Sequence, residues 1–338
     1  MSNITTIDAS GRRERLKEFF VGDGAKIWFF HDSLDILPRL AAAGCMDEKT
    51  VVYVSSSWYV GDYGAGVCLK TLRQCQGHIG DRFDVTRNIV FLANSKAELA
   101  HLQARLPPQS EVLLVNNTCF LDTQLFSILP DAGKKWNCVV NAKPMAFKRL
   151  HLAARVPNKA LITYDTHEPD RGNASRTPPD QLGFTATFNN LPEDQVVAKL
   201  NNSNVGLMLS EEEGACYANT EYLLCGLLVV STPSRGGRDE FYDSFTAVIC
   251  EPDQDAVHDA VELALARLKS GEITPEVIRT RTLDRIAAFR NTLAGSLCEK
   301  QQRFGLNIDF ESHLRACLTG NNKMKSQRNF FVVDWTSS

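Results

Sequence analysis

Several features that would assign a protein class at once are missing from this sequence. No apolar run approaches the roughly 18 residues of a membrane-spanning helix, and the first residues contain no signal-peptide core, so we expect a cytoplasmic protein with at most peripheral membrane contact. The ten cysteines form no C-x-x-C pair, which favours buried free thiols over disulfides or a zinc site. With 37 basic and 40 acidic residues, the charge gives no sign of nucleic-acid binding. No G-x-G-x-x-G follows a predicted first strand, which disfavours an NAD dehydrogenase.

The chain does contain a regular alternation of short apolar runs and amphipathic segments. Its 338 residues favour two domains, each with its own core. In the first half, residues 1–24 predict a short helix, and four strands are predicted at 25–30, 51–55, 88–92 and 111–115. Between these strands the pattern predicts helices at 34–43, 67–76 and 95–106, with a turn at 61–66. Strands that alternate with helices form a parallel sheet with covered faces, and ligands of such sheets bind beyond the carboxyl ends of the strands.

A polar, turn-rich segment at 130–135 marks a boundary, after which the pattern restarts. We therefore predict an N-terminal domain at 1–133 and a C-terminal domain at 134–317, with the tail 318–338 packing back on the first domain. The predicted strands of the second domain lie at 136–141, 160–164, 185–188, 205–209, 227–230 and 247–250. The predicted helices lie within 143–155, after Pro192, from Ala215, and at 254–269, 275–293 and 297–317. Both domains should be Rossmann-like.

The stretch from Ser210 to Glu240 contains most of the residues that indicate chemistry. Acidic residues close a strand, Gly214 allows a sharp turn, and a helix should start near Ala215. The N-terminus of a helix at the carboxyl end of a strand favours anions, because its N–H groups lack intrahelical acceptors and face the crevice. We expect a phosphate there, with Glu213 and Glu221 on its sugar side.

Residues 136–265 resemble the nucleotide-sugar domain of retaining GT-B glycosyltransferases, of the group 1 or glycogen-synthase-like type. In that family a Glu, seven residues and a second Glu form the signature, and Glu213 and Glu221 match this spacing. The run 225–230, C-G-L-L-V-V, matches the C-G-x-P-V-V of the family except for a leucine at the proline position. A later G-G-x-x-E turn is matched by residues 236–240.

The resemblance implies two Rossmann-like domains with a cleft between them, and a sugar donor bound to the second domain. It places Glu213 near the donor sugar as the catalytic candidate and Glu221 at the ribose hydroxyls. The donor-binding residues that it implies are Lys143, Lys148, Arg149, Gly214, Ala215, Cys216, Tyr217 and Glu221. Basic side chains and backbone N–H groups would stabilise the phosphate that leaves with the nucleotide, without a metal or a cofactor.

The first half contains no motif of this family, so its candidates rest on their places after predicted strand ends. They are His31, Asp32, Asp62, Asn116 and Asn117. For His31, a packed or capping role is as compatible with the sequence as a role in the site. Asn116 and Asn117 cannot act as bases, but their amides could orient sugar hydroxyls.

Three other features in the second half admit an alternative chemistry. Asp253 and Asp255 imitate a metal-binding D-x-D, but they open a helix after a proline, where Asp is a good cap. A second possible cation cluster contains Asp165, His167 and Glu168, and a solvated loop fits it better. A helix N-terminus could lower the pKa of the Cys216 thiol, although we favour backbone donation at that position.

The resemblance therefore implies a retaining, metal-independent glycosyltransferase of polysaccharide biosynthesis. It would move a sugar from a nucleotide-sugar donor to a glycan or glycoconjugate acceptor. Two alternatives stay open: a sugar-nucleotide epimerase or phosphorylase on the same fold, and a non-catalytic nucleotide-sugar-binding protein.

Overall fold

The computed structural model describes residues 16–32, 34–164, 179–309 and 312. Its contacts divide the chain into two compact units. Unit 1 comprises Met1–Asp122 and Ala288–Ser338, and unit 2 comprises Thr123–Ala287. The sequence predicted the domain boundary at 133/134, with only the tail 318–338 packing back on the first domain. That tail lies outside the described residues. The return to unit 1 instead occurs within helix α7 (Pro275–Phe304).

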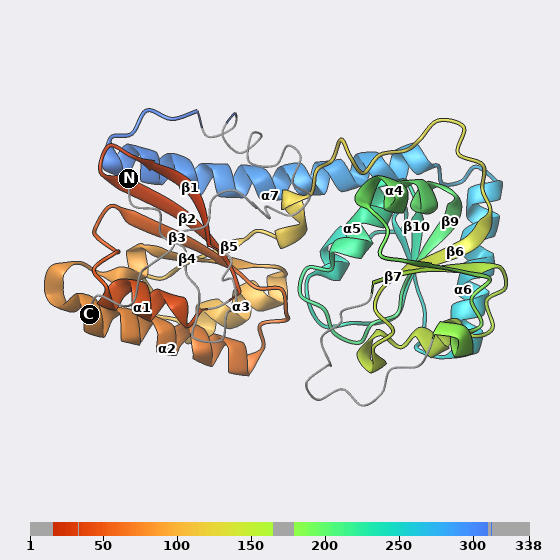
Figure 1. Cartoon of the computed structure of the whole chain (residues 1–338), viewed down its shortest axis with the longest axis horizontal. Helices are drawn as coiled ribbons and strands as arrows, with labels where there is room; N and C mark the ends of the chain where they lie inside the picture. Colours follow the sequence, from red (N-terminus) through yellow and green to blue (C-terminus); the bar gives the residue numbers. More distant parts are fainter. Residues whose placement is uncertain (1–15, 33, 165–178, 310–311, 313–338) are drawn as a thin grey trace. The chain divides into compact units, whose positions relative to one another are not determined.

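Unit 1 is built on a five-stranded sheet in which the strand order follows the chain. Four strands are parallel: β2 (Ala25–His31), β3 (Thr50–Ser55), β4 (Ile89–Ala93) and β5 (Glu111–Leu114). The connecting helices are α1 (Ile36–Ala42), α2 (Asp62–Ile79) and α3 (Lys96–Arg105). Right-handed crossovers that all advance in one direction put these helices on one face. Figure 1 shows them together below the sheet, while the C-terminal part of α7 covers the other face.

The N-terminal prediction for this unit is wrong, because residues 16–22 form a strand, β1 (Leu16–Gly22), and not a helix. It pairs antiparallel with β2, and Gly22 faces Ala25 across a two-residue turn. Both turn residues, Asp23 and Gly24, have positive φ, as a type I′ hairpin requires. The Asp-Gly dipeptide between two apolar runs was the available signal.

Unit 2 contains a parallel six-stranded sheet of order β11-β10-β9-β6-β7-β8. Its strands are β6 (Trp136–Asn141), β7 (Lys159–Thr163), β8 (Ala186–Asn189), β9 (Ser203–Met208), β10 (Leu228–Ser231) and β11 (Ala247–Ile249). Its helices are α4 (Glu193–Asn201), α5 (Tyr217–Leu224) and α6 (Gln254–Lys269). The chain order reverses between β6 and β9, which is where ligands of doubly wound sheets bind. The predicted α/β class with two parallel sheets is confirmed; among the described strands, the reversal occurs in the second sheet alone.

Two helix predictions in the second half need correction. Residues 143–155 form two short 3₁₀ turns, η4 (Ala146–Lys148) and η5 (Leu150–Ala153), because Arg149 between them takes a left-handed conformation. Residues 275–304 form one helix, α7, where two were predicted. The Ala-Gly-Ser at 294–296 does not break it. A single helical glycine costs only about 1 kcal/mol, and Leu293 and Leu297 on either side are buried.

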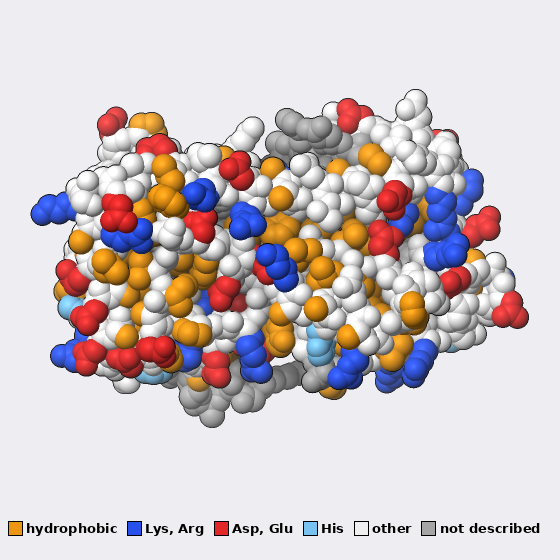
Figure 2. Space-filling model, turned by 180° about the vertical axis from the view of Figure 1, so that it is seen from behind, with side chains coloured by type: hydrophobic (Ala, Val, Ile, Leu, Met, Phe, Trp, Pro, Cys, Tyr) orange, Lys and Arg blue, Asp and Glu red, His pale blue; other side chains and the backbone are white. Residues whose placement is uncertain are grey.

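Side chains of both signs are interspersed on the face drawn in Figure 2, which agrees with the near-balanced charge of the sequence. Among the described residues, no helix has the length and apolar character needed to cross a bilayer.

Gly206 in β9 provides a test of the packing of unit 2. A Cβ at this position would lie 2.2 Å from Cδ2 of the fully buried Tyr222 ring. We expect Gly206→Ala to lower the free energy of unfolding by about 1–3 kcal/mol, since the buried ring has to shift. In contrast, Gly66→Ala on the exposed face of α2 meets nothing within 4 Å and should stabilise by about 0.5–1 kcal/mol. Scanning calorimetry would measure both, and equal effects of the two substitutions would contradict the packing described.

Candidate functional site

The residues with the chemistry expected of a phosphate and sugar site meet at the carboxyl ends of β6 and β9. The Lys148 ammonium, at the end of η4, forms an ion pair with the carboxylate of Glu213 in the loop after β9. Both side chains are mostly buried. Burial alone would lower the pKa of Lys148, but the Glu213 carboxylate in contact with it raises the pKa above its ordinary value. The lysine is therefore a fixed cation at neutral pH.

The backbone on both sides of Glu213 is held by the Gly-Gly turn at 236–237. The Glu213 N–H donates to the Arg235 carbonyl at 2.9 Å, and the Gly237 N–H donates to the Gly214 carbonyl at 2.6 Å. Gly236 has a φ of 123°, and a Cβ there would lie 1.6 Å from the Glu213 carbonyl oxygen. Only glycine allows the two segments to cross this closely. The Gly-Gly motif is thus explained by the position that it gives to Glu213.

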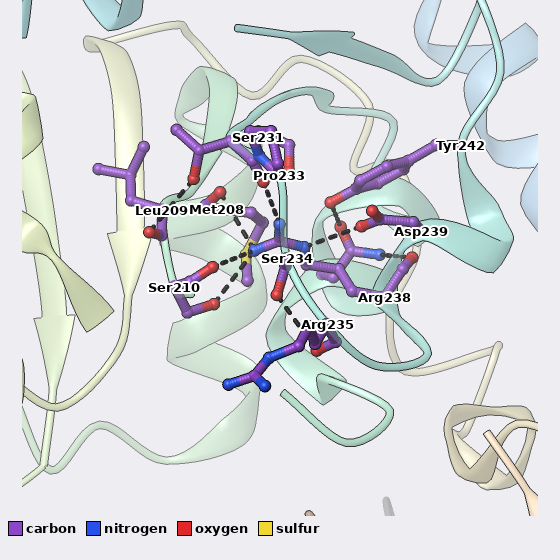
Figure 3. A network of polar contacts seen from close by, with 12 residues as sticks. Met208, Leu209, Ser210, Ser231, Pro233, Ser234, Arg235, Arg238, Asp239 and Tyr242 are labelled. Carbon is purple, nitrogen blue, oxygen red and sulfur yellow. Dashed lines mark hydrogen bonds and ion pairs between the residues drawn. The ribbon is translucent and has the colours of Figure 1, made fainter. Parts of the chain in front are cut away.

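Arg238, one residue beyond that turn, is one of two site residues that sequence reasoning missed. Its side chain is fully buried. The guanidinium donates to the Ser210 hydroxyl and carbonyl at 3.1 and 3.2 Å, to the Met208 carbonyl at 3.3 Å and to the Thr232 carbonyl. It also lies 3.2 Å from a carboxylate oxygen of Asp239. Figure 3 shows these groups around the guanidinium.

These contacts tie the ends of β9 and β10 to one cation. Burial would lower the pKa of Arg238, but the neighbouring Tyr242 and Asp239 raise it, and an arginine stays charged in proteins in any case. The only sequence signal was the pattern R-G-G-R-D-E, in which an arginine would ordinarily be solvated.

Helix α5 begins at Tyr217, two residues later than predicted, because Cys216 takes a left-handed φ of 60°. The N–H groups of its first turn lack intrahelical acceptors, so the anion-binding character of this end remains. The predicted lowering of the Cys216 pKa is wrong. Burial, and then the Glu213 carboxylate, raise the pKa of the Cys216 thiol to about 12, although Lys148 and Arg238 oppose the shift. The thiol is therefore protonated at neutral pH and is a poor nucleophile.

Glu221 lies on the side of α5 that faces the end of β6. The Asn141 side-chain amide donates to its carboxylate at 3.1 Å, and the Asn141 backbone N–H donates to the Tyr222 hydroxyl. Glu221 itself is buried. Asn141 thus joins the site as a residue that sequence reasoning missed, and its position at a strand end was the available signal.

The other two predicted basic residues have different surroundings. The Lys143 ammonium lies 4.9 Å from the centroid of the half-exposed Tyr164 ring. Arg149 donates from Nε to the Leu209 carbonyl at 2.7 Å and from a terminal nitrogen to the Thr232 hydroxyl at 2.9 Å. Arg149 therefore braces the start of the loop that contains Glu213.

In unit 1, three of the five predicted residues meet beyond the carboxyl ends of β2, β3 and β5. His31 Nδ1 lies 3.0 Å from the Ser55 hydroxyl and 3.1 Å from the Asn117 amide nitrogen, and Nε2 contacts the Ser57 hydroxyl. Asp32 has a left-handed φ of 63° and accepts from the Ser57 N–H at 2.7 Å. A non-glycine residue in this conformation persists only where its surroundings impose it.

The remaining two predicted residues are Asn116 and Asp62. The Asn116 amide is used within its own loop, where it accepts from the Thr118 N–H at 3.0 Å and donates to the Asn94 carbonyl at 2.8 Å. Asp62 is the first residue of α2 and not part of a turn; its side chain lies outside the described part of the chain.

The loop 56–61 between β3 and α2 is held next to this cluster from several sides. Its carbonyl at Ser56 accepts from the Asn94 amide at 3.0 Å, and its N–H at Val60 donates to the buried Glu98 carboxylate at 2.9 Å. Burial raises the pKa of Glu98, although the backbone N–H groups of Val60 and Asn94, which donate to its carboxylate, oppose the shift. The loop presents Trp58 with more than half of its surface exposed. A rigidly held, exposed aromatic ring beside polar groups is suited to a ligand with both apolar and hydroxylated faces.

Among the described residues, the acidic pattern that resembles a metal-binding motif has a structural role. The Asp253 carboxylate caps α6 by accepting from the N–H groups of Asp255 and Ala256 at 2.9 and 3.0 Å, which confirms the capping interpretation. Asp255 forms an ion pair with Arg155. Asp165, His167 and Glu168 lie outside the described residues.

Comparison with known proteins relates this arrangement to one family. Residues 183–275 match the family Glycosyl transferases group 1, and this segment contains Glu213, Glu221 and Arg238. No curated protein matches the sequence. Among solved structures, sucrose-phosphate synthase from Thermosynechococcus elongatus is 16% identical, with a TM-score of 0.53 over 80% of this chain and 78% of that chain. HepE from Anabaena, in complex with UDP, is 14% identical, with a TM-score of 0.54 over 80% and 78%. A glycosyltransferase from Rickettsia africae is 12% identical, with a TM-score of 0.51 over 80% of each chain. The chain has the GT-B fold that these structures share.

Substitution of the two arginines that flank the Gly-Gly turn compares the contributions of a buried and an exposed cation to the stability of unit 2. Arg238→Ala removes a fully buried cation together with its hydrogen bonds to the ends of β9 and β10. We therefore expect a loss of about 3 kcal/mol or more in the free energy of unfolding of unit 2. Arg235→Ala removes a side chain that is 65% exposed and paired with Glu212 at 2.7 Å, so its effect should stay within about 1 kcal/mol. Denaturant unfolding of both variants measures the difference. A tolerated Arg238→Ala would show that this cation does not hold the strand ends together.

Proposed function

We propose that this chain, which is a glycosyltransferase with the GT-B fold, takes its sugar from a nucleotide-sugar donor bound to unit 2. The observation that carries the proposal is the convergence of the Lys148–Glu213 ion pair, the start of α5 and Glu221 at the point where the sheet reverses. This combination offers a cation and N–H donors for phosphate, and carboxylates for hydroxyl groups. Glu213, Glu221 and the start of α5 lie in the segment 183–275 that matches the glycosyltransferase family, and Lys148 contacts this segment through Glu213.

In the proposed reaction, Lys148 and the first-turn N–H groups of α5 stabilise the phosphate oxygens of the departing nucleotide. Negative charge develops on these oxygens as the bond to the sugar breaks, and preorganised donors are usually the largest catalytic contribution. Glu213 would accept from the donor sugar hydroxyls, and Glu221, oriented by Asn141, from the ribose. Lys143 would reach the phosphates from the loop after β6. Because cations and N–H groups could supply the charge stabilisation, we propose that no metal takes part.

The nucleotide and the stereochemistry are proposed from a similar structure and from the family resemblance. HepE, one of the similar structures, is described with UDP and with UDP-glucose, so uridine nucleotides are the first to test. Retention of configuration at the anomeric carbon is proposed from the resemblance of residues 136–265 to retaining enzymes.

We further propose that unit 1 binds the acceptor, a glycan or glycoconjugate, at the carboxyl edge of its sheet. His31, Asn117 and Ser57 would contact hydroxyl groups there, and Trp58 would pack against the apolar face of a sugar ring. The held loop 56–61 fixes the distance between the polar and aromatic contacts. The activity would serve polysaccharide biosynthesis in the cytoplasm.

The proposed function predicts that the chain binds a nucleotide. A nucleotide that binds the folded chain alone should raise its stability by about 2.7 kcal/mol at a hundredfold excess over its Kd. Thermal-shift measurements with UDP, GDP, ADP, CMP and dTDP, each with and without EDTA, should show this for at least one nucleotide and no effect of EDTA. In Lys148→Ala the shift should shrink, because the phosphate loses its nearest cation. If no nucleotide shifts the transition, the donor proposal is wrong, and a shift that EDTA abolishes would contradict metal independence.

Two adjacent glutamates provide a matched test of catalysis. Glu213→Gln should lower the rate of sugar transfer by about 10²-fold or more, while the nucleotide still binds, since Lys148 and the N–H groups remain. Glu212→Gln, one residue earlier, removes only the charge that pairs with Arg235 and should leave the rate close to that of the wild type. Nucleotide release and product formation would be measured in parallel for both variants. Rapid release of sugar phosphate or an epimerised donor, in place of a transferred sugar, would favour a phosphorylase or an epimerase.

A further inference from the structure

Unit 1 contains an open groove of about 550 Å³ on the edge of the sheet opposite the His31 cluster. Its residues come from the C-terminal half of α2, from the segment 81–86 that precedes β4, and from Pro107 and Gln109, which precede β5. All of these lie near the amino ends of the strands, whereas His31, Asp32 and Asn117 lie after carboxyl ends. The proposed transfer reaction makes no use of this groove.

The groove is preformed, because one side chain fixes its wall. The Gln76 amide donates to the carbonyls of Gly80 and Phe83 at 2.6 and 3.0 Å, and its oxygen accepts from the Val85 N–H at 2.9 Å. Asp84 caps the next turn by accepting from the Thr86 N–H at 3.0 Å. A loop held at four backbone positions keeps the groove open.

The lining of the groove combines apolar and charged side chains. Its apolar residues include Leu69, Leu72, Phe83 and Val85; Leu69 and Phe83 are only partly buried although they pack against the core of the unit. Its charged residues are Arg73, Asp81 and Asp84. Such a surface is suited to a short apolar segment that is preceded by basic residues and contains one acidic residue.

The described part of the chain ends near this groove. Arg303, in the last turn of α7, donates to the carbonyls of Arg87 and Glu48 at 3.3 and 3.5 Å. Arg87 directly follows the groove residues Val85 and Thr86. Leu306 is buried beyond the helix end, so the chain is still attached to unit 1 there.

Residues 313–338 come next in the chain, and their sequence has the pattern that the groove requires. Lys323, Lys325 and Arg328 precede F-F-V-V-D-W at 330–335, in which five of the six residues are apolar. The 17 residues from 313 to 329 span up to roughly 60 Å when extended, which is ample for the reach. We propose that the segment 330–335 of this chain binds in the groove, with its aromatic and valine side chains against the apolar lining residues and Asp334 at Arg73.

A tethered segment needs little intrinsic affinity to stay bound. A short linker gives an effective concentration of about a millimolar, so the groove would be occupied even if its affinity for the segment were low. Docking would also remove from solvent an apolar, β-prone segment that would otherwise promote aggregation.

Fluorescence of Trp335 in the full chain tests the docking. Of the other three tryptophans, Trp28 and Trp136 are only 2% and 9% exposed, whereas Trp58 is 58% exposed. In a Trp58→Phe background, acrylamide quenching therefore reports on Trp335. We expect Trp335 to be protected in this background. Quenching as strong as in the urea-unfolded chain would overturn the proposal.

Charge reversals identify the groove and the intramolecular contact. Arg73→Glu and Asp334→Arg, each in the Trp58→Phe background, should raise the quenching constant severalfold, and the two together should restore protection. Lys70→Glu makes the same charge change on α2 outside the groove and should have no effect. Equal effects of Arg73→Glu and Lys70→Glu would overturn the assigned groove. Protection that disappears on dilution would overturn the tethered contact and indicate a second copy of the chain as the occupant.

Discussion

The buried guanidinium of Arg238 is the interaction on which the arrangement of unit 2 depends. A charge without access to water is tolerated only when every donor has an acceptor, and here backbone carbonyls supply most of them. Those carbonyls belong to Met208 and Ser210 at the end of β9 and to Thr232 just after β10. One cation therefore fixes two neighbouring strand ends and the first residues of the loop that leads to Glu213. The side chain touches no proposed substrate, yet it determines where the catalytic candidate can be.

Arg149 has the corresponding role on the other side of the same loop. It donates to the Leu209 carbonyl and the Thr232 hydroxyl, so it binds the same two strand ends as Arg238 from a different segment. Its left-handed backbone ends the turn that contains Lys148, and this places the Lys148 ammonium opposite Glu213. Since the Gly-Gly turn holds the backbone of Glu213, both partners of the ion pair are fixed through their main chains, and only the side-chain ends remain to respond to a ligand.

The sequence was sufficient for the alternation of elements and for the set of residues that meet at β6 and β9. Parallel topology brings strand ends to one edge, and the resemblance of residues 136–265 to the family pointed to Glu213, Glu221 and Lys148 before their contacts were known. The buried state of Arg238 could not be predicted, because it depends on carbonyls from strands thirty residues earlier and six residues earlier in the chain. The start of α5 was misplaced because Cys216 takes a left-handed conformation, which is uncommon for a residue other than glycine and which the sequence of residues 214–217 does not signal. For residues 16–22 a local signal was present but was not used. The Asp23-Gly24 turn that follows them indicates a hairpin, but the spacing of their apolar residues also fits a helix, and a helix was predicted.

Unit 1 has a polar surface at the carboxyl ends of its parallel strands and an apolar groove at their amino ends. Parallel strands end in polar loops at one edge, and here the strained Asp32, His31 and Asn117 are held there by hydrogen bonds that a purely structural edge would not require. At the other edge the connections are short capped turns, so helices and turns leave an apolar gap that nothing in the described residues fills. A helix that connects two parallel strands runs from their carboxyl edge back to their amino edge, so α2 borders both surfaces. A ligand at one edge and a peptide segment at the other would therefore contact opposite ends of α2, and the two surfaces remain chemically distinct although a single helix connects them.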